Sequence, residues 1–214
     1  MIDCGADWLR RATGLDPTAI LITHAHADHA GGLREGILCP VFATQESWDR
    51  IRTGSIPERV IVKPQTPVKI GGIYFEAFPL EHSIRAPAVG YRIAVDQVSA
   101  FYAPDVVSIH DRRKALRGIQ LYIGDGASVT RSILRKCGNR FIGHASIRTQ
   151  LEWCRNEGVR RAIFTHCGTE IVTGDRDVIH KKVAALGEQA GVEASVALDD
   201  MKLILRSHGV RSAQ

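Results

Sequence analysis

In the stretch ILITHAHADHAGGL, residues 20–33, an apolar run leads directly into His24, His26, Asp28 and His29. Residues two apart in an extended segment project to the same side, so the first two histidines can bind one cation. The aspartate and the third histidine begin the following turn and can serve a second, adjacent cation. Imidazole and carboxylate groups suit zinc, manganese or iron. Four side chains cannot complete two sites, so we expect further ligands downstream.

The composition restricts the kind of protein in which this cluster lies. With 214 residues, of which 44% are hydrophobic and 24% charged, the chain can bury a core without a structural metal. Its five cysteines are scattered and never spaced as CxxC, which is typical of reduced thiols in the cytoplasm. No stretch approaches the roughly 18 apolar residues of a membrane span, and the opening MIDCGADWLRRATG does not look like a signal peptide. We therefore expect a cytoplasmic protein with no membrane contact and a functional metal site.

The charge balance is mildly basic, with 28 Lys and Arg against 23 Asp and Glu. A net charge of +5 fits a small anionic substrate. Two basic groups stand out, Arg112–Lys114 and the set Arg131, Arg135, Lys136 and Arg140. No aromatic residues are interleaved with them in the sequence for base stacking, so we interpret them as solvated helix faces. Nucleic acid is a less favoured partner, and a homodimer is left open.

Short apolar runs alternate with amphipathic stretches along the chain. The runs predict strands at 19–23, 41–44, 59–62, 72–80, 90–95, 98–103, 119–124, 161–165 and 201–206. In KIGGIYF, Gly71 and Gly72 predict a hairpin turn. Apolar residues at helical spacing predict helices within 146–158 and 175–190. No repeat or linker interrupts this alternation, which indicates a single layered α/β domain over residues 1–214.

The HxHxDH motif at the end of an apolar strand, followed by glycines, resembles that of the metallo-β-lactamase-fold hydrolases. The resemblance covers nearly the whole chain and implies an αββα sandwich. Members carry a third histidine, a bridging aspartate and a final histidine, each after a strand. It implies that His24, His26 and His82 hold a first metal, that Asp28, His29 and His166 hold a second, and that Asp105 bridges them.

The bridging aspartate is the least certain ligand. Asp105, in YAPD, matches the family position best, but Asp125 and Asp96 also end apolar strands. If Asp105 is the bridge, Asp125 can lie nearby and orient a ligand.

Residues 82–93, HSIRAPAVGYRI, and a histidine between a glycine and a helix, His144, resemble the phosphodiesterase branches of the family. These are the tRNA 3′-processing endonucleases and the cyclic phosphodiesterases of phosphonate breakdown. The resemblance implies that His144 assists the leaving group; its alternative role is helix capping or packing. Asp28 is the other residue assigned to catalysis. Arg85 and Arg148 are either phosphate contacts or surface arginines, and we expect His110, His180 and His208 to be solvated.

These features favour a hydrolase that cleaves a small, perhaps cyclic, phosphodiester with a hydroxide shared by two zinc or manganese ions. A lactone or other ester is the alternative substrate. The absent signal peptide argues against a secreted β-lactamase. Flavodiiron-type oxygen chemistry would favour glutamate at position 26, where this chain has histidine. Only 48 residues follow His166, which fits poorly with the C-terminal helical region of the glutathione thioesterase branch. We see no insertion that could form a tRNA-holding arm. Family members usually have a pair of strands before IDCG, so we also consider an N-terminally shortened, inactive metal-binding protein.

Overall fold

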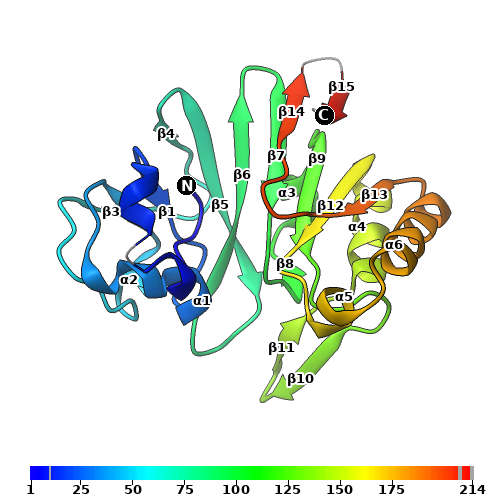
Figure 1. Cartoon of the computed structure of the whole chain (residues 1–214), viewed down its shortest axis with the longest axis horizontal. Coiled ribbons are helices and arrows are strands. Elements are labelled where there is room, and N and C mark those ends of the chain that lie inside the picture. The colour runs from blue at the N-terminus through cyan, green and yellow to red at the C-terminus, as the bar shows by residue number, and fades with distance from the viewer. Residues whose placement is uncertain (10, 207–208, 213–214) are drawn as a thin grey trace.

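The computed structural model describes residues 1–9, 11–206 and 209–212, which form two β-sheets with helices on their outer faces (Figure 1). The larger, mixed sheet has the order β13 (Glu193–Val196), β12 (Arg161–Thr165), β9 (Leu121–Asp125), β7 (Val98–Tyr102), β6 (Ala88–Val95), β5 (Ile73–Glu81) and β4 (Val68–Ile70), and β8 (Ser108–Ile109) pairs with β5. The smaller, parallel sheet has the order β1 (Ile20–Leu21), β2 (Val41–Ala43) and β3 (Arg59–Ile61). Two antiparallel pairs complete the strands: β10 (Ile133–Cys137) with β11 (Arg140–His144), and β14 (Leu203–Arg206) with β15 (Gly209–Ser212).

The two sheets pack face to face through the apolar side chains of β1, β5 and β6. Leu21 packs with Phe75 and Tyr91 between them, and the Tyr91 hydroxyl donates a 2.9 Å hydrogen bond to the Ile22 carbonyl. Because side chains alternate along a strand, Ile20 and Ile22 face the opposite way, into a second core beneath the N-terminal helices. One short strand thus contributes to two layers.

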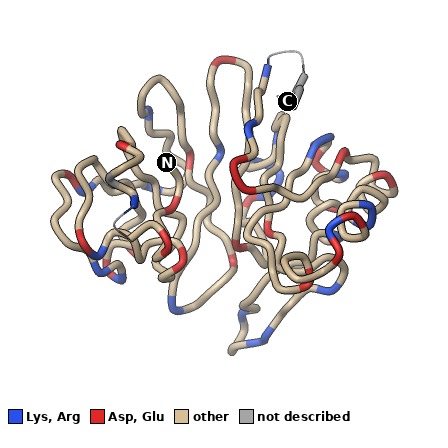
Figure 2. The backbone as a smooth tube through the Cα atoms, viewed as in Figure 1, with Lys and Arg blue, Asp and Glu red and all other residues tan. Residues whose placement is uncertain are grey.

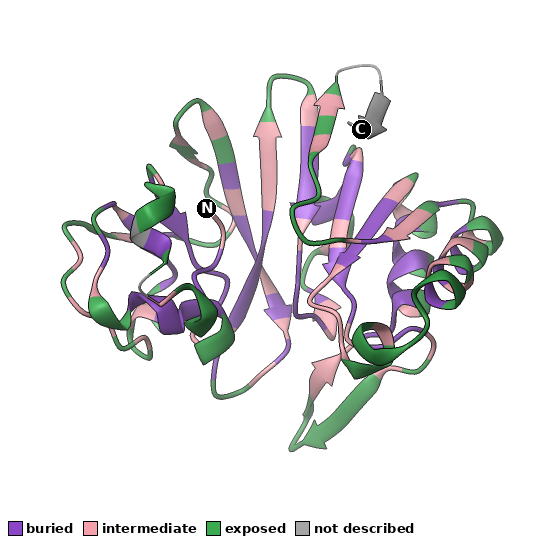
Figure 3. Ribbon diagram, viewed as in Figure 1, coloured by how far each residue is buried: buried purple, intermediate pink, exposed green. Residues whose placement is uncertain are grey.

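Helices cover the outer face of each sheet. On the smaller sheet lie η1 (Ala6–Trp8), η2 (Ala12–Leu15), α1 (Ala27–Ala30), η3 (Gly31–Glu35) and α2 (Gln45–Trp48). On the larger sheet lie α3 (Arg112–Leu116), α4 (Ile147–Glu157) and α6 (Arg176–Ala190), with α5 (Thr169–Thr173) at the edge. Buried residues concentrate between these layers (Figure 3). This is the αββα sandwich predicted from the sequence.

The predicted strands and helices are present, with ends that shift by a few residues. Gly71 and Gly72 turn at φ 54° and 87°, where Ile70 pairs with Ile73. The helix α4 begins at Ser146, whose hydroxyl accepts from the Thr149 amide, and ends at Gly158 in the left-handed region. Asp175 and Gly191 cap α6 in the same way.

One interpretation was wrong. Arg131, Arg135, Lys136 and Arg140 do not lie on a helix: the last three belong to the β10–β11 hairpin and Arg131 precedes it. Gly138, at φ 61°, permits the tight turn between Cys137 and Arg140. The other basic group, Arg112–Lys114, does lie on a helix, α3.

Three histidines were expected to be solvated. His110 is exposed and His180 is half-buried on α6, whereas His208 lies outside the described residues. In the described ranges, no helix combines the length and the apolar character that crossing a membrane requires.

Candidate metal centre

The strand directions bring the predicted ligands to one edge of the sandwich. β5 and β7 each pair antiparallel with β6, so they run parallel to one another, and β9 and β12 are parallel to β7. The carboxyl ends of these four strands therefore meet at the same edge. His82, Asp105 and His166 each follow one of them, and Asp125 ends another. The motif after β1 lies at the same edge, because these residues contact its histidines.

The first group of side chains is His24, His26 and His82. His26 Nδ1 lies 2.9 Å from His24 Nε2 and 3.3 Å from His82 Nε2. A tetrahedral zinc ion with Zn–N bonds of 2.0–2.1 Å requires nitrogens about 3.3 Å apart. Burial lowers the pKa of all three histidines, most strongly that of His24. They are therefore neutral at physiological pH, the state in which imidazole binds a metal.

The second group is Asp28, His29 and His166. Asp28 Oδ2 lies 3.3 Å from His166 Nε2 and 3.5 Å from His29 Nε2. His166 adopts a positive φ of 51°, which is uncommon for a residue with a side chain and occurs at functional sites. A cation among these three groups would meet one carboxylate and two imidazoles.

Asp105 lies between the two groups. Its carboxylate is 2.7 Å from His29 Nε2, 3.5 Å from His166 Nδ1 and 3.8 Å from His82 Nε2. Burial alone would raise its pKa, but His29 and the other histidines hold that pKa well below its usual range, so the group is a carboxylate. Of the three aspartates considered from the sequence, Asp105 alone has contacts to both groups. Asp96 is exposed in the β6–β7 turn.

Asp125 instead binds His144. Its Oδ2 lies 2.8 Å from His144 Nδ1 and also accepts from the Val106 amide. Gln150 on α4 fixes this strand end, because its side-chain amide donates to the Asp125 carbonyl at 2.7 Å and its oxygen accepts from the Asp125 amide. Burial lowers the pKa of His144, but the hydrogen bond that its Nδ1 donates to Asp125, together with nearby carboxylates, raises it more, so the net pKa lies above the usual value.

Two supporting residues were missed from the sequence. Asp3 Oδ2 lies 2.7 Å from His29 Nδ1, and its Oδ1 accepts from the Thr23 amide at 2.7 Å. The Thr23 hydroxyl lies 3.1 Å from His24 Nδ1. A carboxylate that accepts from one ring nitrogen leaves the other free for a metal, so this pair orients both groups. The feature that distinguishes Asp3 is its positive φ, which is uncommon for a residue other than glycine and can be seen only in the structure.

The arrangement fits divalent cations. His166 Nδ1 is a buried atom without a hydrogen-bond partner, and the buried atoms His29 Nε2 and Asp105 Oδ2, 2.7 Å apart, have no partner besides each other; all three face the centre of the cluster. Burial would lower the pKa of His29, but its hydrogen bonds to Asp105 and Asp3 raise that pKa to about 10. The proton thus occupies a position between two anions where a cation would be favoured.

The two arginines suggested as phosphate contacts lie on the surface around this edge. Arg85 is exposed in the loop after His82, and Arg148 is exposed on the first turn of α4.

Comparisons with known proteins agree with this geometry. A family model described as "Beta-lactamase superfamily domain" matches residues 1–167. Ribonuclease Z of Thermobifida fusca (strain YX) is 34% identical over 126 residues, 49% of this chain but only 36% of that protein. Ribonuclease Z of Methanopyrus kandleri is 26% identical over 219 aligned positions, covering 80% of this chain and 77% of that protein. A solved diphosphatase from the PhnP family superposes with a TM-score of 0.63 at 19% identity, covering 92% of this chain and 76% of the other.

Proposed function

The chain belongs to the beta-lactamase superfamily, and on this premise we propose that it is a metal-dependent hydrolase of phosphodiesters with two divalent cations at the centre described above. The observation that carries the proposal is the convergence of two ligand groups on Asp105, with His144 beside them. The ribonuclease Z relatives are named for the cleavage of RNA phosphodiesters, and the PhnP-family protein is named as a diphosphatase, so all three names refer to the cleavage of phosphate linkages. Together they favour a phosphodiester over a lactone.

In this proposal, His24, His26 and His82 hold one cation, Asp28, His29 and His166 hold the other, and Asp105 contacts both. Bound there, two divalent ions would supply an activated water and would neutralise charge on the phosphoryl oxygens. Zinc and manganese are both compatible with these nitrogen and oxygen ligands. Asp28 is also a candidate catalytic residue, because it is the most exposed of the carboxylates at this centre.

The chain's own contribution is to hold groups in fixed protonation states. Asp3 keeps the His29 Nδ1 proton in place, so that Nε2 faces the centre. His82 Nδ1 donates to the Gly143 carbonyl at 3.0 Å, which likewise directs His82 Nε2 inward. Neither imidazole can rotate without breaking a buried hydrogen bond, so the ligand geometry is set before substrate binds.

His144 is the proposed proton donor. Asp125 holds its Nδ1 and raises its pKa, so the ring is protonated at a higher pH than an isolated histidine. It lies 3.5 Å from Asp105, which puts it next to the ligand shared by both groups. A donor in this position can protonate the departing oxygen, a contribution of about 10²–10⁴-fold.

The test pairs metal content with turnover on one preparation. We expect stoichiometric zinc or manganese and hydrolysis of bis(p-nitrophenyl) phosphate, extended to a panel of linear and cyclic diesters and lactones. His26→Ala should lose metal and activity, whereas His144→Ala should keep the metal and lose rate. Turnover of lactones alone would assign the chain to ester chemistry. Metal without any turnover would make it a binding protein, and full activity of His144→Ala would remove its role as the acid.

A further inference from the structure

The β10–β11 hairpin projects from the sandwich at the edge that holds the candidate metal centre (Figure 1). All five residues of β10 are exposed, as are Arg140 and Phe141 of β11 (Figure 3). Arg140 and Phe141 of β11 border a small pocket with His82 and Ile84, whereas the side chains of β10 extend into solvent. They are available to a partner.

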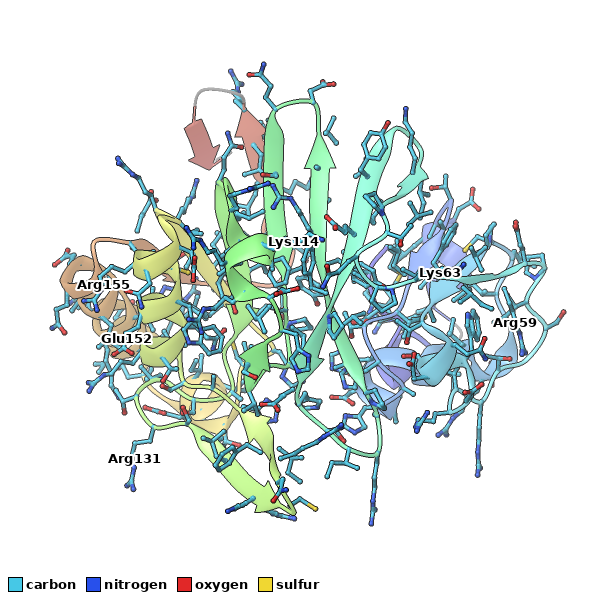
Figure 4. All side chains as sticks on the ribbon, turned by 180° about the vertical axis from the view of Figure 1, so that it is seen from behind. Arg59, Lys63, Lys114, Arg131, Glu152 and Arg155 are labelled. Atoms are coloured by element: carbon cyan, nitrogen blue, oxygen red, sulfur yellow. The ribbon has the colours of Figure 1, made fainter. Side chains whose placement is uncertain are left out.

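The hairpin segment is uniformly basic. Between Asp125 and Glu152 the sequence has no acidic residue and five basic ones: Arg131, Arg135, Lys136, Arg140 and Arg148. Five charges equal the whole net surplus of the chain. The hairpin accordingly shows only basic colour in Figure 2, and Arg131 extends outward beside it in Figure 4. This concentration forms a local anion-attracting surface.

The register places the basic side chains relative to the active site. Directly opposed residues share a face, so His144, Ile133, Arg135 and Arg140 lie on one side of the ribbon. At about 3.3 Å per residue, Arg140 is about 13 Å from His144 along the strand, and Arg135 is at the level two residues away, about 7 Å. A chain whose scissile phosphate lies at His144 would pass these two arginines.

Apolar groups stand among the charges. Ile133, Leu134 and Phe141 are large apolar side chains that are 54%, 49% and 48% exposed. Lys136 is paired with Phe141 across the hairpin, so this aromatic ring and cation share the face of the ribbon opposite to His144, Arg135 and Arg140. Basic groups that track a backbone and an aromatic group that stacks a base together bind unpaired strands, whose base faces are open. A duplex hides those faces. The ribbon is only two strands wide, so a flexible single strand can contact the arginines on one face and Phe141 on the other.

The base of the hairpin is joined to a candidate metal ligand. The Gly143 amide donates to the His82 carbonyl at 2.9 Å, and His82 Nδ1 donates back to the Gly143 carbonyl at 3.0 Å. Gly143 has φ 121°, and a Cβ there would collide with the Ile133 carbonyl oxygen. The hairpin is therefore fixed in direction relative to the metal centre.

We propose that the β10–β11 hairpin is a docking arm for a single-stranded nucleic acid, which it guides past Arg140 and Arg135 to the metal centre. This inference rests on the proposed function, and it names the substrate class as a polynucleotide rather than a small diester. Each phosphate contact on a single strand contributes about 0.7 to the slope of log K against log salt. Two contacts give about 1.4, or about 25-fold in affinity at 0.1 M salt relative to 1 M.

The experiment measures binding of a labelled single-stranded oligonucleotide of about 20 nucleotides, longer than one such site, by fluorescence anisotropy across a salt series. We expect Arg135→Gln with Arg140→Gln to bind about 25-fold more weakly, with a slope smaller by about 1.4. The charge-matched control is Lys63→Gln with Arg155→Gln, two exposed residues away from the hairpin (Figure 4), which should bind as the wild type does. Phe141→Ala should weaken binding about 5- to 150-fold, the range for one stacked base.

Several outcomes would refute the proposal that the hairpin docks a single-stranded nucleic acid. Equal losses in the hairpin and control variants would indicate non-specific charge, and poly-glutamate that competes as well as the oligonucleotide would indicate a general polyanion surface. A doubled molar mass in light scattering that Phe141→Ala abolishes would assign the hairpin to self-association. Because binding needs no turnover, a wild-type protein that hydrolyses bis(p-nitrophenyl) phosphate but binds no oligonucleotide refutes the arm and leaves the proposed function standing.

Discussion

Replacing Asp3 by asparagine tests how the second metal group is organised. The substitution keeps the shape and tolerates the positive φ of this position. It changes one oxygen into an amide donor. In the wild type, Oδ1 accepts from the Thr23 amide and Oδ2 accepts from His29 Nδ1, so both oxygens act as acceptors. Asparagine can satisfy only one of these two donors.

Either orientation of the amide is costly. If the oxygen stays on Thr23, the NH₂ group faces His29 Nδ1, which must then accept, and the ring proton moves to Nε2 where the metal should bind. If the amide flips, the buried Thr23 N–H loses its acceptor. An unsatisfied buried donor costs about 1–3 kcal/mol, and removing a carboxylate behind a metal-ligating histidine costs about 10- to 100-fold in affinity. A cost of about 1–3 kcal/mol corresponds to about 5- to 150-fold, since about 1.4 kcal/mol is tenfold, and this range includes the 10- to 100-fold loss of metal affinity that we expect.

The assay is chelator competition for zinc, combined with calorimetry in two buffers of different ionisation enthalpy. His29, with its pKa raised to about 10, must release a proton when a cation replaces it, so wild-type affinity should rise with pH below that value. In Asp3→Asn this release should disappear, because His29 is no longer held protonated between two carboxylates. Asp7→Asn, exposed on η1, is the control. Wild-type affinity with unchanged proton release in Asp3→Asn would refute the argument.

Three other substitutions or conditions test the charge on His29, the acid role of His144 and the packing of the core. In the metal-free protein, with chelator present, the raised pKa of His29 stabilises the fold fully below pH 6.5, and this stabilisation is lost as the pH rises toward about 10. The urea concentration at the midpoint of unfolding should therefore fall over that pH range, and a midpoint that does not change with pH would contradict this prediction. Asp125→Asn should remove the main group that raises the His144 pKa, so the alkaline limb of the rate profile should shift to lower pH. It should also slow the release of alkoxide leaving groups more than that of p-nitrophenolate; equal effects on both would argue against acid assistance. Phe78→Ala, at a fully buried position, should lower the free energy of unfolding by about 3–5 kcal/mol in chemical denaturation, and a loss below 1 kcal/mol would show that the core there is loosely packed.

The fold and the clustering of the candidate ligands were predictable because their signals are local. His82, Asp105 and His166 each stand just after an apolar run, and parallel strands gather such positions at one edge. The HxHxDH motif then identifies which edge. The choice between Asp105 and Asp125 as the bridging ligand could not be made from local sequence, because both residues follow apolar strands. It depends on which carboxylate reaches the HxHxDH motif in the folded protein.

The supporting contacts were not predictable for the opposite reason. Asp3 is 26 residues from His29, and Gln150 is 25 residues from Asp125. Neither pair leaves a spacing pattern, since the partners meet only after the sheets have formed. Hydrogen bonds of this kind depend on three-dimensional position, which periodicity does not encode.

The hairpin shows how a local pattern can mislead. Arg131 and Arg135 are four residues apart, which matches one face of a helix, and β10 has no buried face to produce a strand-like alternation of polar and apolar residues. A strand without a buried face must be held by its partner alone, here through the register of Ile133 to Cys137 with Arg140 to His144. That pairing puts His144 on the same face as two arginines. The misassigned charges are therefore the ones that bear most directly on what the centre can bind.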